Sequence, residues 1–278
     1  MLNDLKIAFF GTPGFAVSIL DELDKSGIKP DLIVTNPDEP KGRKLIITPP
    51  PVKIWAIKNN IPVIQPEKLS VSDFVSLKTF DLSIVAAYGK IIPEEILNLP
   101  KHGTLNVHPS LLPKYRGPSP LQSAILNGDT ETGVSIMLLD KEMDHGPIIA
   151  QEKFALLNQL YLPELKEALA KVAGQMLIKI IPDWIVGKVR ATPQDHSKAT
   201  FCKKITTTEG LIDLSDPIKS DRVVRALNPD PGAYMMLGGK RVKILSGHIE
   251  GDSYMPERII PEGKKEMAWE DFKKGNKI

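Results

Sequence analysis

The sequence predicts an α/β protein of two domains, the first built on a parallel sheet and the second a small β domain. Three observations support this prediction. Short apolar runs alternate with helix-compatible stretches in the first 188 residues. From Lys188 the sequence becomes rich in Thr, Pro, Ser and Lys, and short β-like segments with Gly and Pro follow. Finally, the length of 278 residues exceeds the usual single core of about 100 to 150 residues.

Four apolar runs in the first half of the chain are typical of strands, and they cover Leu5–Phe10, Asp31–Thr35, Leu82–Ala87 and Thr104–His108. A helix is expected after the first run, because Phe15, Ile19 and Leu23 recur at helical spacing. Two more strands are expected at Val134–Leu139 and Ile148–Phe154, and an amphipathic helix over Pro163–Trp184 closes the domain. Strands that alternate with helices predict a Rossmann-like parallel sheet.

We place the first domain at residues 1–188, a linker at 189–202 and the second domain at 203–278. The expected elements of the second domain are strands at 211–214, 233–237 and 240–245 and a helix near 220–227. This pattern predicts a small OB-like β-barrel. Between Gly247 and Pro261 we see little strand-like sequence, so we expect the barrel to be shortened.

Charge and composition exclude several classes of protein. The 36 basic and 34 acidic residues nearly cancel, so nucleic-acid contact would have to come from local patches. The region 198–278 carries 15 basic against 12 acidic residues. Cys202 is the only cysteine, which excludes an intrachain disulfide and cysteine-rich metal clusters and favours a cytoplasmic protein. No apolar run reaches the ~18 residues of a membrane span. We expect a monomer without a metal.

The turn at Gly11–Ala16 is similar to a dinucleotide-binding fingerprint, but Pro13 replaces its middle glycine. We see no acidic residue that would bind the ribose. We therefore interpret this segment as a tight turn between a strand and a helix.

A stronger signal for chemistry begins at Asn106. Strand side chains alternate between faces, so Asn106 and His108 project together, while Pro109 ends the strand. The carboxyl ends of strands in open parallel sheets are where ligands bind. The sequence therefore predicts a polar site here, although an Asn and His pair taken alone is more often structural.

Longer motifs surround this pair. Residues 106–120 read NVHPSLLPKYRGPSP, and residues 140–147 read DKEMDHGP. Together with FFGTPGFAV at 9–17, the segment 35–53, AAYGKIIP at 86–93 and RALNPDPGAY at 225–234, they resemble the methionyl-tRNA formyltransferase family. The resemblance covers nearly the whole chain in order.

This resemblance implies transfer of a formyl group from 10-formyltetrahydrofolate to the amino group of methionine on initiator methionyl-tRNA. It also implies that Asn106, His108 and Asp144 form the catalytic set. The chemistry suits these residue types. Attack of an amine on a formyl carbonyl develops negative charge on oxygen, which Asn106 and a protonated His108 can stabilise. A carboxylate beside the imidazole can orient it and relay protons.

Binding residues are also implied by the resemblance. The folate pocket would be formed by two loops, at Tyr88, Gly89, Lys90 and Ile91 and at Ser110, Leu111, Leu112 and Pro113. The basic loop within 36–51 would enter the acceptor stem of the tRNA, with Arg43 sensing its terminal base pair. The expected RNA-binding residues are Lys41, Arg43, Lys44, Lys203, Lys204 and Arg241.

Two alternatives remain at this stage. The first is a folate-dependent formyltransferase that acts on an amino-sugar nucleotide or another small amine, and the basic loop and tail argue against it. The second is a catalytically inactive RNA-binding protein, which would not require paired polar residues at the end of a strand. Formyl transfer to charged initiator tRNA or to free amines would separate these readings.

Overall fold

The computed structural model describes residues 5–42, 45–156 and 160–276, which fold as two compact units. The first unit contains the residues up to Gly117, Gly133–Phe154 and Glu167–Phe201. The second unit contains Pro118–Thr132, Ala155–Lys166 and the residues from Cys202 onward. The chain therefore passes between the units more than once, and nearly all of the segment 189–202 belongs to the first unit.

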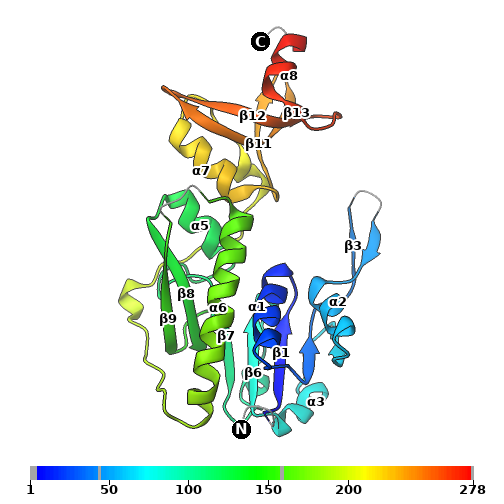
Figure 1. Ribbon diagram of the computed structural model, residues 1–278, viewed down its shortest axis with the longest axis vertical. Helices are drawn as coiled ribbons and strands as arrows, with labels where there is room; N and C mark the ends of the chain where they lie inside the picture. The colour runs from blue at the N-terminus through cyan, green and yellow to red at the C-terminus, as the bar shows by residue number, and fades with distance from the viewer. Residues whose placement is uncertain (1–4, 43–44, 157–159, 277–278) are drawn as a thin grey trace. The chain divides into compact units, whose positions relative to one another are not determined.

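A mixed sheet forms the centre of the first unit (Figure 1), and its seven strands among the described residues follow the order β5-β2-β1-β6-β7-β8-β9. Their bounds are Val63–Ile64, Leu32–Val34, Ile7–Gly11, Leu82–Ala86, Thr104–His108, Glu131–Leu138 and Ile148–Ala155. The strands from β5 to β7 are parallel, whereas β7 and β8 are antiparallel. The strands predicted for this domain are confirmed. The two-residue strand β5 was too short to leave a pattern in the sequence.

Helices cover both faces of this sheet. They are α1 (Gly14–Lys25), α2 (Pro51–Lys58), α3 (Val71–Phe74), the 3-10 helix η2 (Val75–Thr79), α4 (Glu94–Leu97) and α6 (Leu162–Ile185). Helix α6 passes so close to α1 that a Cβ on Gly174 would clash with Glu22. Helix α2 is tied to α1 by the Trp55 indole, which donates to the Asp21 carboxylate at 2.7 Å. Pro51 at its first position is preorganised to start this helix.

The core on the other face of the sheet gathers around Phe10. Strand residues alternate, so Ala8 and Phe10 of β1 share this face, and both are fully buried. The Phe10 ring stacks with Phe74 of α3 at 5.9 Å and meets the ring of Tyr88 edge-on at 5.5 Å. These contacts fix the end of β6, after which the Tyr88 loop begins.

The predicted basic loop contains a two-stranded hairpin. Strand β3 (Glu39–Lys41) pairs antiparallel with β4 (Ile46–Thr48), whose β-branched residues favour extended backbone. Arg43 and Lys44 lie outside the described residues, so their predicted roles rest on the sequence. On the described part of the hairpin, Leu45, Ile46 and Ile47 are highly exposed. Three large apolar side chains are thus consecutive in the sequence and accessible to solvent.

The second unit contains an open sheet of four antiparallel strands in the described chain, ordered β10-β11-β12-β13. These strands cover Ala233–Leu237, Lys240–Glu250, Ser253–Pro261 and Met267–Ala268. The helices of this unit are α5 (Pro120–Asn127), η4 (Thr207–Gly210), α7 (Pro217–Leu227) and α8 (Trp269–Asn276). The predicted helix near 220–227 is confirmed as α7, which Asp216 caps by accepting from the Lys219 amide.

The expectation of little strand structure between Gly247 and Pro261 is wrong. Strand β11 continues to Glu250 and β12 occupies nearly all of the remaining segment. Polar residues and two prolines mask the strand pattern in the sequence, but Tyr254 and Ile259 are fully buried and the long β11 ladder supplies the pairing. The segment 211–214 forms a single parallel bridge, between Leu211 and Tyr234, rather than a strand.

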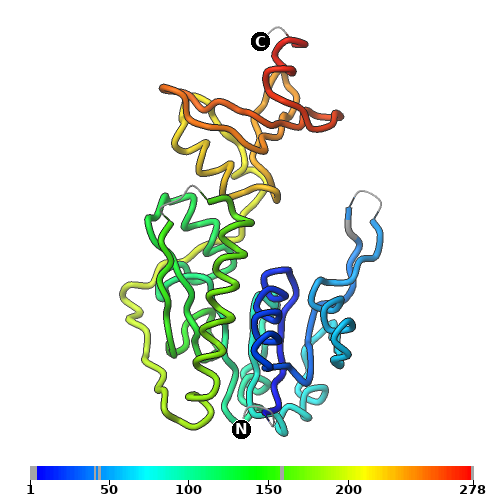
Figure 2. The backbone as a smooth tube through the Cα atoms, in the orientation of Figure 1, coloured from blue at the N-terminus to red at the C-terminus, as the bar shows by residue number. Residues whose placement is uncertain are grey.

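Residues 190–201 run back along the first unit (Figure 2). Thr192 forms an antiparallel bridge with Ile148 at the start of β9. Further on, 3-10 helix η3 covers His196–Lys198, and Thr200 accepts a hydrogen bond from the Arg116 amide at 2.8 Å. Among the described helices, none is both long and apolar enough to cross a membrane.

Replacing Phe10 with Ala should lower the free energy of unfolding by about 3–5 kcal/mol, because it leaves a cavity against Phe74 and Tyr88. Urea denaturation followed by circular dichroism measures this. The control is Ile57→Ala, an exposed apolar residue of α2, which should change stability by no more than about 0.5 kcal/mol. Equal losses in the two variants would contradict this description of the core.

Candidate active site

The predicted pair at the end of β7 is buried and points to one carboxylate. Asn106 and His108 are 8% and 4% exposed. The Asn106 amide nitrogen lies 3.5 Å from Asp144 Oδ1, and His108 Nδ1 lies 3.4 Å from the same oxygen. Strand alternation puts both side chains on one face, and the structure brings all three residues of the predicted catalytic set together.

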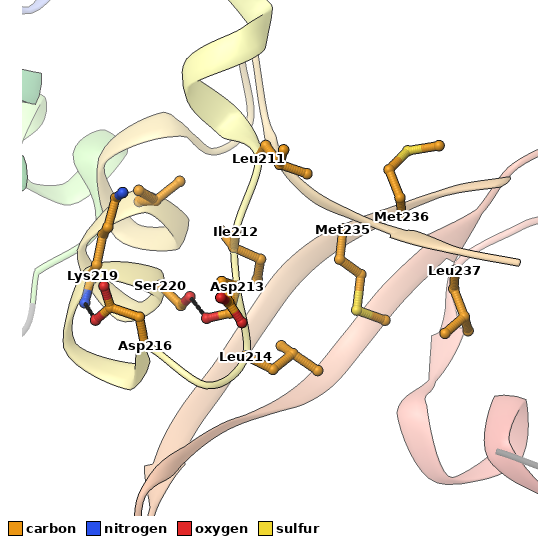
Figure 3. A pocket seen from close by; sticks show the side chains of 11 residues that line it. Leu211, Ile212, Asp213, Leu214, Asp216, Lys219, Ser220, Met235, Met236 and Leu237 are labelled. Carbon is orange, nitrogen blue, oxygen red and sulfur yellow. Dashed lines mark hydrogen bonds between the residues drawn. The ribbon is translucent and has the colours of Figure 1, made fainter. Parts of the chain in front are cut away.

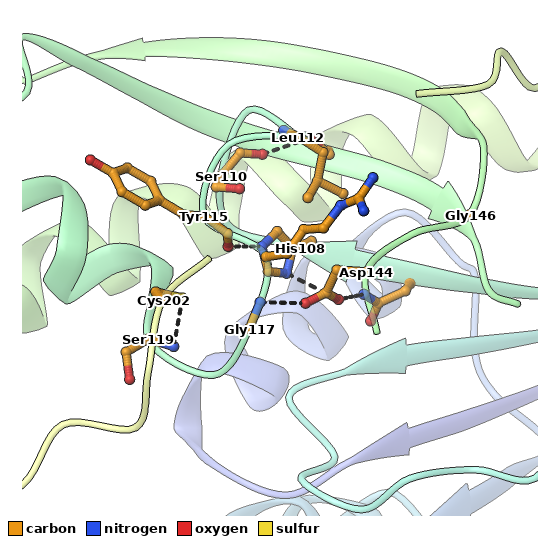
Figure 4. Close-up of polar contacts among 12 residues, drawn as sticks. His108, Ser110, Leu112, Tyr115, Gly117, Ser119, Asp144, Gly146 and Cys202 are labelled. Atoms are coloured by element: carbon orange, nitrogen blue, oxygen red, sulfur yellow. Dashed lines mark hydrogen bonds and ion pairs between the residues drawn. The ribbon is translucent and has the colours of Figure 1, made fainter. Parts of the chain in front are cut away.

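Asp144 comes to this cluster from the loop between β8 and β9 (Figure 4). Its second carboxylate oxygen, Oδ2, accepts a hydrogen bond from the backbone amide of Gly117 at 2.8 Å. The Asp144 backbone has a φ of 50°, in the left-handed region that is uncommon for residues with a side chain. A residue held in this conformation indicates that its surroundings constrain it, as is frequent at functional sites.

The contact of the other ring nitrogen of His108 shows which of the two nitrogens carries a hydrogen. His108 Nε2 lies 2.9 Å from the Tyr115 carbonyl oxygen. A carbonyl oxygen can only accept, so Nε2 carries the hydrogen. The nitrogen that faces Asp144 is therefore the one that can gain or lose a proton while this contact persists.

The predicted Ser110–Pro113 loop is held by buried polar contacts. Ser135 of β8, the register partner of His108, donates through its hydroxyl to the Ser110 carbonyl at 2.6 Å and accepts from the Leu112 amide at 3.0 Å. Gln151 of β9 donates to the Leu112 carbonyl and to the Ser135 hydroxyl, both at 2.8 Å. Sequence reasoning missed Ser135 and Gln151, because their contacts span 16 to 39 positions of the chain.

The Tyr88 loop, residues 88–91, contributes backbone groups and the apolar side chain of Ile91. The Tyr88 ring is in the core, where burial raises the pKa of its phenol to about 12. Its carbonyl accepts from the Thr12 hydroxyl and the Asn36 amide, each at 3.1 Å. This polar group lies at the carboxyl ends of β1, β2 and β6, where a parallel sheet binds ligands.

The remaining predicted folate residues of this loop differ in exposure and contacts. Gly89 has a φ of 85°, which favours glycine. The Lys90 ammonium donates to the carbonyls of Pro66 and Glu67 at 2.8 and 3.0 Å. Ile91 is 92% exposed, which is unusual for a large apolar side chain.

The Gly11–Ala16 turn is used for close packing. A Cβ on Gly11 would lie 2.8 Å from the Cβ of Ala16 and 3.0 Å from the Ala86 carbonyl oxygen, both too close. Glycine is therefore needed to let the turn pass against β6. This agrees with the interpretation of the segment as a tight turn.

The predicted RNA-binding residues of the second unit lie on its surface. Lys203 and Lys204 are exposed. The Arg241 guanidinium lies over the Tyr234 ring at 3.7 Å, a cation–π contact. In the first unit, Lys41 is the last residue of β3. Lys41 therefore belongs to the β3–β4 hairpin, whereas the Asn106 cluster belongs to β7 and the loop between β8 and β9.

A cavity of about 600 Å³ lies in the second unit (Figure 3), between α7, the segment 211–214 and β10. Its lining is mainly apolar and includes Leu214, Val223 and Met235. The carboxylate of Asp213 accepts from Ser215, and that of Asp216 caps α7. Because its polar groups have structural roles and none of the predicted catalytic residues lines it, this cavity is not the candidate active site.

No group of three or more metal-ligating side chains occurs in the described parts of the chain. The described groups at the end of β7 are instead suited to hydrogen bonding and proton transfer. They combine an amide donor and an imidazole, each within 3.5 Å of the same carboxylate oxygen. Such a set can stabilise negative charge on an oxygen and move a proton.

Comparison with known proteins agrees with this chemistry. A family model described as formyl transferase matches residues 5–181, which include the whole candidate catalytic set. The chain belongs to the formyl transferase family. A second model, formyl transferase, C-terminal domain, matches residues 204–257. Members of this family transfer a formyl group, so this protein is an enzyme.

Several relatives of this formyltransferase extend the similarity over most of the chain. The methionyl-tRNA formyltransferase of Chloroflexus aurantiacus is 43% identical over 249 residues, which cover 88% of this chain and 80% of that protein. The methionyl-tRNA formyltransferase of Myxococcus xanthus is 37% identical and covers 98% of this chain and 96% of its own. The resemblance predicted from the motifs is confirmed.

Solved structures support the fold. A 4-N formyltransferase from Francisella tularensis is 22% identical with a TM-score of 0.68, covering 88% of this chain and 98% of its own. HypX from Aquifex aeolicus, in complex with tetrahydrofolic acid, is 15% identical with a TM-score of 0.68 and covers 97% of this chain and 47% of its own. At these identities the likeness concerns the fold alone.

We expect His108→Ala to lower the turnover of formyl transfer by about 100-fold or more, since it removes a buried proton-transfer and hydrogen-bonding group. Initial rates at saturating substrates, on protein with an unchanged circular dichroism spectrum, measure this. His102→Ala is the control, because the described contact of His102 with Trp184 uses only its carbonyl. Near-normal turnover in folded His108→Ala would exclude this role.

Proposed function

We propose that this enzyme transfers the formyl group of 10-formyltetrahydrofolate to the amino group of methionine on initiator methionyl-tRNA. The observation that carries the proposal is the convergence of Asn106, His108 and Asp144, in a chain that resembles methionyl-tRNA formyltransferases over nearly its full length. The cluster supports the reaction type, and the similarity of the whole chain supports the amine substrate.

Each residue of the cluster has a proposed role that follows from its hydrogen bonds. Asn106 Nδ2 is a neutral donor that can stabilise negative charge on the formyl oxygen. His108 can accept a proton from the attacking amine at Nδ1, because Nε2 is committed to the Tyr115 carbonyl. Asp144 lies beside that nitrogen and stabilises the imidazolium that results.

The folate would supply a formyl group already bound to nitrogen. The residues proposed to hold it are the Ser110–Pro113 loop and the backbone of the Tyr88 loop. Two observations fit such a ligand. Asn36 Oδ1 is buried without a partner among the described residues, so it can accept a hydrogen bond from a ligand with N–H groups. Ile91 of the Tyr88 loop exposes an apolar side chain, which can cover a flat ring.

Formylation of a small amine is the competing function, because solved structures with this fold include sugar N-formyltransferases. Two observations favour tRNA. The relatives with 37–43% identity are methionyl-tRNA formyltransferases. In addition, the exposed β3–β4 hairpin and the cationic residues of the second unit offer more binding surface than a small amine would need.

The deciding experiment compares acceptors under one set of conditions. The enzyme is incubated with 10-formyltetrahydrofolate and either initiator methionyl-tRNA, elongator methionyl-tRNA or an amino-sugar nucleotide. Formylmethionine released from the tRNA and formylated sugar are quantified separately. We expect transfer to initiator methionyl-tRNA. Transfer to the sugar alone would replace the proposed function by its competitor.

Asp144→Asn keeps the shape of the side chain and removes its charge. We expect turnover to fall by about 100-fold or more, while folate affinity stays within about threefold, because the carboxylate faces His108 and not the Ser110–Pro113 loop. Stopped-flow turnover and fluorescence titration with folate measure the two quantities. Glu142→Gln, an exposed carboxylate of the same loop, is the control. Loss of folate affinity alone would make Asp144 a binding residue.

The tRNA proposal also predicts a dependence on salt. Lysines that contact phosphates release counterions, so Lys41→Ala and Lys44→Ala should each flatten the plot of log affinity against log salt by up to about one unit. Arg43→Ala should instead narrow the rate advantage of initiator over elongator methionyl-tRNA. Binding titrations at several salt concentrations and paired initial rates test these effects. Salt-independent binding by the wild-type enzyme would remove the basic loop from tRNA recognition.

A further inference from the structure

The segment that leads out of the first unit places Gln194 against the main chain of the Asp144 loop. On one side of Gln194, the Thr192 amide donates to the Ile148 carbonyl at 2.7 Å, and the Thr192 carbonyl accepts from the Ile148 amide at 2.8 Å. On the other side, Thr200 donates to the Pro113 carbonyl at 3.1 Å and accepts from the Arg116 amide at 2.8 Å. The backbone is thus fixed to the first unit on both sides of Gln194.

The Gln194 side chain uses its whole hydrogen-bonding capacity at this place. It is only 6% exposed. Its amide nitrogen donates to the carbonyls of Asp144, at 2.9 Å, and of Gly146, at 2.7 Å. Its amide oxygen accepts from Arg116, from Nε at 3.2 Å and from Nη2 at 2.7 Å. Both hydrogens and both lone pairs of the amide are therefore engaged.

Arg116 determines which way this amide points. A guanidinium can only donate, so it must face the amide oxygen, and the NH₂ group must then face the two carbonyls. Arg116 is itself 4% exposed, and its Nη2 also contacts His196 Nδ1 at 2.8 Å. The reverse orientation would put an oxygen against two carbonyl oxygens and an NH₂ group against a cation.

The two carbonyls that Gln194 holds belong to the turn with the unusual backbone. Asp144 has a φ of 50°, a conformation that persists only where neighbouring contacts support it. The Gly117 amide donates a hydrogen bond to the Asp144 carboxylate, and the Gln194 side chain donates one to the Asp144 main-chain carbonyl. Both contacts restrain the residue whose Oδ1 lies 3.4 Å from His108 Nδ1.

We propose that Gln194 is a positioning residue for Asp144, oriented in turn by Arg116, and that it acts on turnover through the placement of the Asp144 carboxylate beside His108. This inference rests on the proposed catalytic role of Asp144. It assigns a function in catalysis to the segment that follows α6, which the sequence presents as a linker.

The test is a double-mutant cycle in the full-length enzyme, with formylation of initiator methionyl-tRNA as the assay. Gln194→Glu keeps the oxygen that faces Arg116 but replaces the NH₂ donor by a second oxygen. Gln194→Ala removes both contacts. We expect each to lower kcat by about 10- to 100-fold, the scale of a misplaced catalytic group, with KM for the folate within about threefold. Gln175→Ala, an exposed glutamine of α6, is the matched control.

The decisive comparison is made in the Asp144→Asn background. If Gln194 acts through the carboxylate, adding Gln194→Ala there should lower kcat by less than about threefold, because coupled residues are not additive. A full multiplicative loss would assign Gln194 a general structural role and overturn the inference. So would wild-type kcat in Gln194→Glu when Asp144→Asn is inactive. Wild-type activity in Asp144→Asn would instead refute the catalytic role of Asp144, and the positioning role with it.

Discussion

Asp144 and His108 face each other at 3.4 Å with side chains that are 13% and 5% exposed, and a carboxylate so removed from water must regain its lost hydrogen bonds from the protein. The Gly117 amide supplies the shortest of these bonds, at 2.8 Å. Gly117 has a φ of 119°, which residues with a Cβ rarely adopt. The need of a mostly buried carboxylate for a hydrogen-bond donor thus explains why position 117 is a glycine, whose amide makes this contact.

The change of strand direction after β7 supplies the rest of the site. Because β8 runs antiparallel to β7, it places Ser135 opposite His108, where its hydroxyl holds the Ser110–Pro113 loop. The chain then returns through the Asp144 loop to β9, whose Gln151 bonds to the same hydroxyl. One reversal of direction therefore brings the imidazole, its carboxylate and the supports of the predicted folate loop to the same end of the sheet.

The patterns that could be predicted from the sequence are those with a local cause. Apolar runs located β1, β6 and β7, and the alternation of strand side chains placed Asn106 and His108 together. Motif resemblance, rather than periodicity, brought in Asp144. Gln194 and Ser135 were missed because their roles depend on contacts with residues 16 to 78 positions away. The strand β12 was missed for a related reason, since its polar sequence becomes extended through pairing with β11.

The location of the cluster also bears on how one fold serves different amines. Asn106, His108, Asp144 and Gln194 all belong to the first unit. Solved structures with 15–22% identity share this fold, and one of them is a sugar 3N-formyl transferase. Catalytic groups that only stabilise charge and move protons need not recognise the remainder of the acceptor. Selection of a tRNA then requires additional surface, and because the overall charge is only +2, that surface must be local. The exposed β3–β4 hairpin and the Arg241 region of the second unit are the surfaces that we propose for this selection, and neither contains a residue of the Asn106, His108 and Asp144 cluster.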